Sequence, residues 1–357
     1  MRSLARWVGV FLASVLMVAA ANATATAEEG VARVSIGYGR NQPSPRLVAP
    51  GEWLPHSCYL AVPYRGGSTL RFERRETHYT LSIDGGPEQP AWIGVRKTDD
   101  LDVLKRELDR GSRGFAVLCH VSQLASLPPL PRGHDIALAV TGDLPDFASL
   151  SKQRGVAALA LYFKELADLG PLAEFSAVTS LRLTRRGGTS DLRPLARLAK
   201  LTYVRLSGFD ELTDLAPLAQ APALRGLEVW GCGKLSGLGS LAAARRLAML
   251  KIRGSKDVSD LAPLAKLAKL NVLHLPQTGV SDLALLASLT ELVELDLSGC
   301  KRVTDLVPLA NLKRLERIHL SGCDGVKDLT PLREMIRRGG KVGVSEELTA
   351  QVKTLRG

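Results

Sequence analysis

The sequence predicts an α/β solenoid, in which stacked repeats form a curved parallel β-sheet on the concave face and short helical or 3-10 turns on the convex face. The first observation is a pentapeptide, Asp-Leu-x-Pro-Leu, that recurs through the second half of the 357-residue chain. The second is the composition, because 45% of residues are hydrophobic but only 5% are aromatic, which favours a core of leucine and alanine. Units of this kind bury their apolar side chains only against their neighbours.

The pentapeptide marks the same position in each unit, and consecutive copies start 22 or 23 residues apart. Its aspartate is predicted to cap the helical turn that follows by accepting hydrogen bonds from free N–H groups. Its proline falls in the first turn, where a missing N–H costs little. Leu306, Leu309 and Leu312 are predicted to pack inward from the convex side. The copies start at Asp168, Asp191, Asp214, Gly237 (degenerate), Asp260, Asp282 (degenerate), Asp305 and Asp328.

Each unit also contains two apolar residues in alternation, which predicts a short strand with both side chains pointing into the core. The pairs are Leu138/Val140, Leu159/Leu161, Leu181/Leu183, Val204/Leu206, Leu227/Val229, Leu250/Ile252, Leu273/Leu275, Leu295/Leu297 and Ile318/Leu320. Successive strands are expected to lie side by side in one parallel sheet.

Three residues after the second apolar residue of each strand pair, the chain turns inward. The backbone N–H and C=O groups at this bend need hydrogen-bond partners. Small, weakly polar residues fill this turn position in the later units, namely Cys232, Ser255, Thr278, Cys300 and Cys323. The earlier units have Asp143, Lys164, Arg186 and Phe209 there. Because a buried unpaired cation is costly, the turns at Lys164 and Arg186 are predicted to open outward and the first repeats to be less regular.

The segment from Leu292 to Leu309 resembles the pattern L-x-x-L-x-L-x-x-N/C-x-x-L of the leucine-rich-repeat family. The Asp-Leu-x-Pro-Leu half is similar to the bacterial, internalin-like class with short units. This resemblance covers residues 136–345. It implies a leucine-rich-repeat solenoid, and protein–protein binding on the concave face as the default function.

The chain begins with a segment typical of a secretory signal peptide, residues 1–27. Arg2 and Arg6 precede an apolar run over residues 8–20, and small residues favour cleavage after Ala27. This predicts an exported protein that is periplasmic, secreted or on the cell surface. An uncleaved membrane anchor is the alternative.

The rest of the chain is expected to have four parts. Residues 28–90 lack the repeat and alternate in short runs, which predicts a small β-rich N-terminal module or cap. Residues 91–135 fit divergent repeats, with strands at 93–95 and 115–117. Clean repeats fill residues 136–332, and residues 333–357 form a C-terminal cap. That cap is predicted to contain a strand at 341–344 and a helix through Leu355 capped by Ser345.

The concave face is the predicted ligand-binding surface, because strand residues between the core residues point outward there. Aromatic and cationic side chains on such a face suit the recognition of a peptide or a glycan; an ordinary solvated sheet face is the alternative. The predicted central column continues from Ala160 through Arg182, Arg205, Glu228, Lys251, His274, Asp296 and His319. The predicted flanking columns contain Tyr162, Trp230 and Arg253 on one side and Tyr203, Glu294 and Arg317 on the other.

His274, Asp296 and His319 occupy adjacent strands of the central column. Their rings and carboxylate would hold a metal only with strain, so a hydrogen-bonded His–Asp–His surface row is expected, with no metal and no cofactor.

The chain has five cysteines, an odd number for an exported protein. The turn position accounts for Cys232, Cys300 and Cys323, which are predicted to be buried thiols; a Cys300–Cys323 bridge is the alternative. Cys58 and Cys119 lie outside the clean repeats. They are predicted to form a disulfide that ties the N-terminal module to the repeats, and non-reducing peptide mapping tests this linkage.

The net charge of +11 places limits on the partner. Arg2 and Arg6 supply two of these charges and residues 28–90 are neutral, so the repeats and C-terminus carry the remaining +9. A basic solenoid suits anionic glycan or lipid surfaces, whereas export disfavours nucleic acid. Solvation of the convex face and loops is the alternative role for these cations.

Catalysis is not expected. His56-Ser57-Cys58 and His134-Asp135 are the compact acid–base or nucleophile candidates, and neither has an elbow, a glycine cradle or a third orienting residue. No phosphate loop or dinucleotide fingerprint occurs. The sequence therefore predicts a non-catalytic exported protein that binds a protein or peptide. The alternatives are an envelope-associated binder of anionic glycan or lipid surfaces, and a hydrolase with its active site in residues 28–130 and the repeats as a docking arm.

Overall fold

The computed structural model describes residues 22–24, 30–37, 46–48, 57–64, 69–74, 78–83, 89–95, 98–112, 115–142, 144, 146–164, 168–185 and 191–357. Before residue 101, the side chains that it describes are those of Ile93 and Val95. The chain divides into two compact units. One contains residues 1–142 and 148–160, and the other contains residues 143–147 and 161–357.

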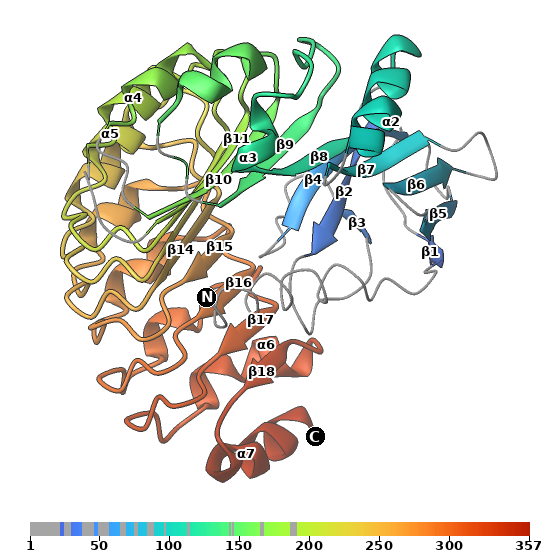
Figure 1. Ribbon diagram of the computed structural model, residues 1–357. Helices are drawn as coiled ribbons and strands as arrows, with labels where there is room; N and C mark the ends of the chain where they lie inside the picture. Colours follow the sequence, from blue (N-terminus) through green and yellow to red (C-terminus); the bar gives the residue numbers. More distant parts are fainter. Residues whose placement is uncertain are drawn as a thin grey trace, which may run out of the picture. The chain divides into compact units, whose positions relative to one another are not determined.

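The first unit begins with antiparallel strands, as the β-rich N-terminal segment predicts. A three-stranded sheet has the order β3-β2-β4. A second series, β1-β5-β6-β7, pairs antiparallel in that order (Figure 1). The strands are β1 (Asn22–Thr24), β2 (Gly30–Gly37), β3 (Arg46–Val48), β4 (Ser57–Tyr64), β5 (Thr69–Arg74), β6 (His78–Ile83) and β7 (Gln89–Val95). The predicted signal peptide lies outside the described residues except for β1.

At β7 the pairing changes from antiparallel to parallel. β8 (Ala116–His120) pairs parallel with β7, and β9 (Ala137–Thr141) pairs parallel with β8. The register joins Ile93 to Val117 and Val117 to Leu138, as expected for divergent repeats. The connection from β7 to β8 is a full helix, α2 (Thr98–Asp109), and the connections around β9 contain α3 (Val121–Leu124) and η1 (Ala148–Gln153).

The second unit is a regular solenoid. β10 (Ala158–Phe163) leads the chain into it, and each strand from β11 to β17 pairs parallel with the next, ending at β18. The predicted inward pairs from Leu181/Leu183 to Ile318/Leu320 are all buried. The strands are β11 (Ser180–Arg185), β12 (Tyr203–Ser207), β13 (Gly226–Trp230), β14 (Met249–Arg253), β15 (Val272–His274), β16 (Glu294–Asp296), β17 (Arg317–His319) and β18 (Lys341–Gly343).

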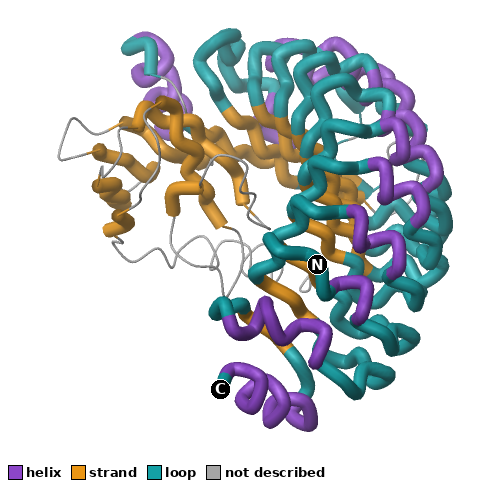
Figure 2. The backbone as a smooth tube through the Cα atoms, turned by 180° about the vertical axis from the view of Figure 1, so that it is seen from behind, coloured by secondary structure: helices purple, strands orange, loops and turns teal. Residues whose placement is uncertain are grey.

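Short helices form the opposite, convex side of this solenoid (Figure 2). Leu306, Leu309 and Leu312 are buried there, as predicted. The elements are η2 (Gly170–Glu174), α4 (Arg193–Ala196), α5 (Ala216–Ala219), η3 (Gly239–Ala243), η4 (Ala262–Lys266), η5 (Ala284–Ser288), η6 (Val307–Leu309) and η7 (Thr330–Leu332). No helix in the described residues has both the length and the apolar character needed to cross a membrane.

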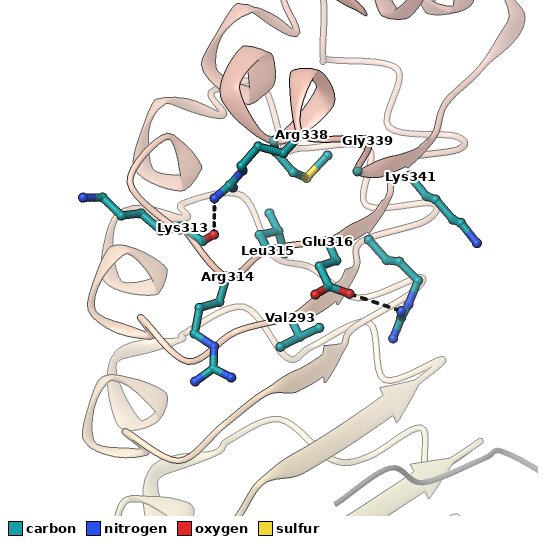
Figure 3. A pocket seen from close by; sticks show the side chains of 11 residues that line it. Val293, Lys313, Arg314, Leu315, Glu316, Arg338, Gly339 and Lys341 are labelled. Carbon is teal, nitrogen blue, oxygen red and sulfur yellow. Dashed lines mark hydrogen bonds and ion pairs between the residues drawn. The ribbon is translucent and has the colours of Figure 1, made fainter. Parts of the chain in front are cut away.

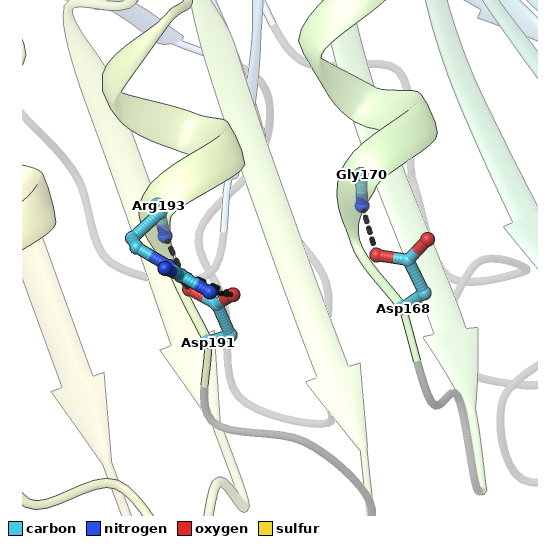
Figure 4. A network of polar contacts seen from close by, with 4 residues as sticks. All are labelled: Asp168, Gly170, Asp191 and Arg193. Atoms are coloured by element: carbon cyan, nitrogen blue, oxygen red, sulfur yellow. Dashed lines mark hydrogen bonds and ion pairs between the residues drawn. The ribbon is translucent and has the colours of Figure 1, made fainter.

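Aspartates begin these convex turns in the way that the repeat predicts. The carboxylate of Asp168 accepts a hydrogen bond from Gly170 N at 2.6 Å, and Asp191 accepts one from Arg193 N at 2.9 Å (Figure 4). Asp214, Asp260, Asp282, Asp305 and Asp328 each accept a bond from the N–H two residues ahead. The aspartate lies two residues before the first residue of the turn, so these are Asx-type bonds that satisfy an otherwise free donor.

The turn position joins adjacent repeats through the carbonyls of the preceding turn. Ser255 Oγ donates to Cys232 O at 3.0 Å, Cys300 Sγ to Leu275 O at 3.1 Å, and Cys323 Sγ to Leu297 O at 3.0 Å. All three cysteines there are buried free thiols. The Cys300–Cys323 bridge is therefore absent from this structure, because both thiols point at carbonyl oxygens.

The earlier repeats are less uniform at this position. Lys164 is exposed, consistent with an outward turn, whereas Phe209 is fully buried. Asp143 and Arg186 lie outside the described residues. Helices α4 and α5 replace the 3-10 turns found in most of the other convex segments.

The C-terminal end is covered by α6 (Arg333–Arg337), β18 and α7 (Glu346–Arg356). Ser345 is the N-cap residue of α7, as predicted, but its side chain makes no capping hydrogen bond. Gln351 attaches this helix instead. Its Oε1 accepts from Leu329 N at 3.0 Å and its Nε2 donates to Lys327 O at 2.8 Å, which satisfies the backbone of the last repeat.

Candidate recognition surface

The central column of the concave face has the register that the sequence predicts. Paired residues lead from Arg182 to Arg205, Glu228, Lys251, His274, Asp296 and His319 on strands β11 to β17. We call these seven residues the polar column. Ala160, the predicted first member, is buried on β10.

Burial divides the polar column into two parts. Arg182, Arg205, Glu228 and Lys251 are only 8%, 7%, 0% and 5% exposed. His274 and Asp296 are half-buried, and His319 is exposed. An ordinary solvated sheet face is therefore wrong for the first four strands of the polar column. The accessible part of the column lies on β15 to β17.

Arg205 is held between an aromatic ring and a carboxylate. Its guanidinium carbon lies 3.7 Å from the centroid of the Trp230 ring, a cation–π distance. Its Nη1 lies 3.7 Å from Glu228 Oε2. Burial lowers the pKa of Arg205, and the nearby charge of Arg182 lowers it further, against the opposing effect of Glu228. The ring and the carboxylate offset part of this desolvation cost.

Glu228 is the most enclosed charged side chain of the column. Both of its carboxylate oxygens are buried, and neither accepts a hydrogen bond from the residues that the structure describes. Lys251 follows on the next strand, where burial lowers its pKa while Glu228, Glu294 and Asp296 act to raise it. Charges of opposite sign thus alternate over Arg205, Glu228 and Lys251, which reduces the cost of burying each one.

A second network forms beside the polar column, on the flanking residue Glu294. His274 Nε2 lies 2.7 Å from Glu294 Oε1. Arg317 Nε donates to Glu294 Oε2 at 2.9 Å, and Arg317 Nη2 forms an ion pair with the same oxygen at 2.8 Å. Burial alone raises the pKa of Glu294. The hydrogen bonds and charges of His274 and Arg317 outweigh that effect and lower the pKa to about 2.

The predicted His–Asp–His row is therefore wrong. His274 pairs across the columns with Glu294, and Asp296 Oδ1 accepts a hydrogen bond from Ser298 N at 2.8 Å. The longer glutamate side chain reaches the imidazole from the adjacent column. No group of three metal-ligating side chains occurs among the residues that the structure describes.

The flanking aromatic residues also differ in exposure. Tyr203 is buried, whereas Tyr162 and Trp230 are half-buried. Gly226, which pairs with Tyr203, leaves room for the phenol ring, since a Cβ there would lie 2.9 Å from Tyr203 Cδ2. Arg253 pairs with Trp230 and is exposed. The exposed cation and the half-buried indole make this flank an accessible part of the concave face.

Sequence reasoning missed Arg185, at the end of β11. This arginine is 2% exposed, and its guanidinium carbon lies 4.3 Å from the centroid of the Phe209 ring. Burial lowers its pKa, while Asp210 opposes the shift. The available signal was Phe209 itself, because a large aromatic residue at a position otherwise filled by small residues needs a partner of matching size.

Cys119 is a buried free thiol in this structure, and burial raises its pKa to about 12. The side chain of Cys58 lies outside the described residues, but Cys119 itself is free, so the predicted Cys58–Cys119 disulfide is not formed in this structure. Burial also raises the pKa of Cys232 and of Cys323 to about 11. These thiols are poor nucleophiles, because the thiolate is the reactive form.

Comparison with known proteins agrees with the repeat architecture. A family model described as "Leucine Rich repeats (2 copies)" matches residues 290–334. The structure of the internalin InlF from Listeria monocytogenes is similar, with a TM-score of 0.54 and 23% identity, and the match covers 71% of this chain and 73% of that chain.

Two further solved structures resemble parts of the chain. Internalin C2 from Listeria monocytogenes is 24% identical over 57% of this chain and 77% of that chain, with a TM-score of 0.38. A leucine-rich-repeat protein from Leptospira interrogans is 18% identical over 60% of this chain and 61% of that chain, with a TM-score of 0.48. A comparison with curated protein sequences finds no match. The repeat sequence, the family match over residues 290–334 and the similarity to InlF together show a leucine-rich-repeat solenoid fold like that of the internalin.

Proposed function

We propose that this protein is a non-catalytic, exported recognition protein that binds another protein or a peptide through the C-terminal half of its concave face, on β14 to β17. One observation carries the proposal. The exposed Arg253 and His319, with the half-buried His274 and Asp296, lie on neighbouring parallel strands in register. This arrangement presents side chains of both charge signs at fixed spacing on one rigid surface.

The Glu294 network supports this choice of surface. His274 and Arg317 are each held by a bond to the same carboxylate, so their side chains are ordered before a partner arrives. Ordering in advance reduces the entropy that binding costs. Wide, rigid surfaces of this kind suit protein partners, and a partner with charges complementary to both signs fits best.

Cysteine chemistry favours recognition over catalysis. Cys119 has its pKa raised to about 12 by burial, which leaves almost no thiolate at neutral pH. His134 Nδ1 lies 3.1 Å from the carbonyl oxygen of Ser112, a structural contact. His56, Ser57 and Cys58 lie outside the residues whose side chains are described, so the hydrolase alternative has no observation in its favour.

Binding is tested with the full chain and a partner captured from the native envelope fraction, with affinity then measured by calorimetry on the purified pair. Arg253→Ala combined with His319→Ala is expected to weaken binding about tenfold or more, since exposed charged anchors are lost. Lys266→Ala on the convex turn η4 is the control, because Lys266 is also exposed. Equal affinity for the wild type and the double variant would move the binding site to another face.

Export is tested separately by N-terminal sequencing of the protein recovered from its native host. We expect the mature chain to start at Glu28, because the small residues before it suit signal peptidase. A chain that still starts at Met1 in the cytoplasmic fraction would contradict export, and it would leave the binding surface unaffected.

A further inference from the structure

A cavity of about 590 Å³ lies on one edge of the solenoid, where the last strands begin (Figure 3). It is formed by the residues that precede β16, β17 and β18 and by the end of α6. Its volume is within the range of small-molecule sites, which is about 300–1,000 Å³. The charged side chains around it are Lys313, Arg314, Arg317, Arg338, Lys341 and Glu316.

Apolar groups line the middle of this cavity. Leu315 and Met335 are buried and Val293 is half-buried. In Figure 3, Leu315 and Val293 lie centrally, whereas Lys313 and Lys341 lie on opposite sides. The cavity thus has an apolar floor and a cationic rim.

The rim cations differ in how far they are neutralised. Arg317 pairs with Glu294 at 2.8 Å, and Arg314 pairs with Glu291 at 2.5 Å. Arg338 donates a hydrogen bond to the carbonyl oxygen of Lys313, which keeps its positive charge uncompensated while it fixes its position.

Lys313 and Lys341 complete the rim. Within the described part of the chain neither side chain forms an ion pair, and both are exposed. Glu316 is the one carboxylate on the rim, and it lies 3.8 Å from Arg317. The rim therefore keeps an excess of positive charge.

We propose that this cavity binds a segment of an anionic saccharide that carries sulfate or carboxylate groups. The cations come from separate loops and lie around the rim, which matches negative groups spaced along a chain better than a single small anion. The apolar floor matches the C–H faces of sugar rings. This inference rests on Lys313, Arg338 and Lys341, which the proposed protein-binding surface does not use, and Arg317 borders both sites.

The test is calorimetric titration of the full chain with a heparin-derived sulfated tetrasaccharide, at about 0.15 M salt, where exposed charges are partly screened. The variant is Lys313→Gln combined with Lys341→Gln. It removes two rim charges and keeps polar side chains at exposed positions, so folding is unaffected, and a thermal melt checks this. We expect affinity to fall about tenfold or more.

The matched control is Lys266→Gln combined with Lys269→Gln, which makes the same change in net charge at two exposed positions of another repeat. We expect this control to bind the tetrasaccharide within about twofold of wild type. An equal loss in both double variants would show diffuse attraction to total charge and overturn the proposal. So would absence of binding to the wild type, or equal binding of a neutral tetrasaccharide.

A further arm distinguishes saccharide from lipid. Vesicles of equal parts phosphatidylglycerol and phosphatidylcholine are titrated with the wild type and the rim variant. We expect no dependence of vesicle binding on Lys313 and Lys341. Vesicle binding that is lost in the rim variant, together with weak tetrasaccharide binding, would assign the cavity to a lipid headgroup and overturn the saccharide.

Discussion

The two halves of the polar column have the same sequence pattern and backbone geometry but different surroundings. On β12 to β14, Arg205, Glu228 and Lys251 are almost fully buried, and their charges are compensated by one another and by the Trp230 ring. On β15 to β17, His274 and Asp296 are half-buried, and His319 is exposed. The same strand position therefore serves structure in one half and remains open to a partner in the other.

This difference shows that the position of a residue within its repeat does not determine how exposed its side chain is to solvent. Both halves repeat every 22 or 23 residues and pair in register. What differs is the neighbouring side chain in the flanking column. The Trp230 indole of the flanking column lies on Arg205, whereas beside Asp296 the flanking residue is the small Ser298, whose N–H bonds the aspartate.

The largest expected effect tests the buried half. Glu228→Gln removes the buried carboxylate between Arg205 and Lys251, so we expect the free energy of unfolding to fall by about 3 kcal/mol. Urea unfolding followed by circular dichroism measures it. Asp296→Asn is the matched change in the open half, and it is expected to cost under about 1 kcal/mol because asparagine still accepts the bond from Ser298 N. Equal costs would remove the distinction between the halves.

The second prediction concerns the Glu294 network at the border of the two halves. Glu294→Gln is expected to lower the free energy of unfolding by about 2 kcal/mol at neutral pH, since the folded state keeps this carboxylate charged. The folded pKa, about 2, lies below the usual value, so this stabilisation is present above about pH 4.5 and is lost as the pH falls towards 2.

Unfolding of wild type and variant at several pH values between neutral and about 3 measures this difference. The two curves are expected to approach each other as the pH falls through that window. A difference that stays constant with pH would show that the Glu294 carboxylate is not held in its charged form by His274 and Arg317.

A third prediction asks whether the scaffold itself is uniform across the two halves. Asp260, which follows β14, and Asp305 accept equivalent bonds, from Ala262 N and from Val307 N, both at 2.8 Å. Replacing either one by alanine is expected to cost about 1 kcal/mol, the typical value of an N-terminal cap. Differential scanning calorimetry measures both. A cost confined to one variant would show that the halves differ in scaffold as well as in surface.

The smallest effect is expected at the exposed end of the column. His319→Ala removes a side chain that is open to water, so the free energy of unfolding is expected to change by under about 0.5 kcal/mol. Thermal unfolding measures this change. A large loss of stability would place His319 with the buried half and take it out of the recognition surface.

Local pattern was enough to predict the scaffold. The alternating leucines imply the parallel strands and their register, and the recurrent aspartates imply the capping bonds, because both depend on residues within one repeat or at the same position in the next. Small residues at the turn position, namely Cys232, Cys300 and Cys323, likewise predicted a buried turn, because small side chains fit there.

Other features lie beyond the reach of such a pattern. The Arg205 guanidinium lies on the Trp230 ring, and His274 bonds Glu294 and not Asp296 because the longer side chain reaches across the columns. Serine is a residue type that commonly caps helices, but the Ser345 side chain makes no capping bond. Gln351 instead bonds the backbone of the last repeat. In each case the outcome depends on side-chain length and direction between neighbouring elements.

The periodicity of the sequence was sufficient to predict that the repeats stack. Leucines at a constant interval are buried from water only when similar units pack against one another. The tertiary packing of the repeats decided which polar residues remain accessible to solvent. The same packing forms the cationic cavity, whose rim combines loops from successive repeats with the end of α6. The physical reason is that burial and charge compensation depend on all neighbours of a side chain, whereas the repeat specifies only those related by its period.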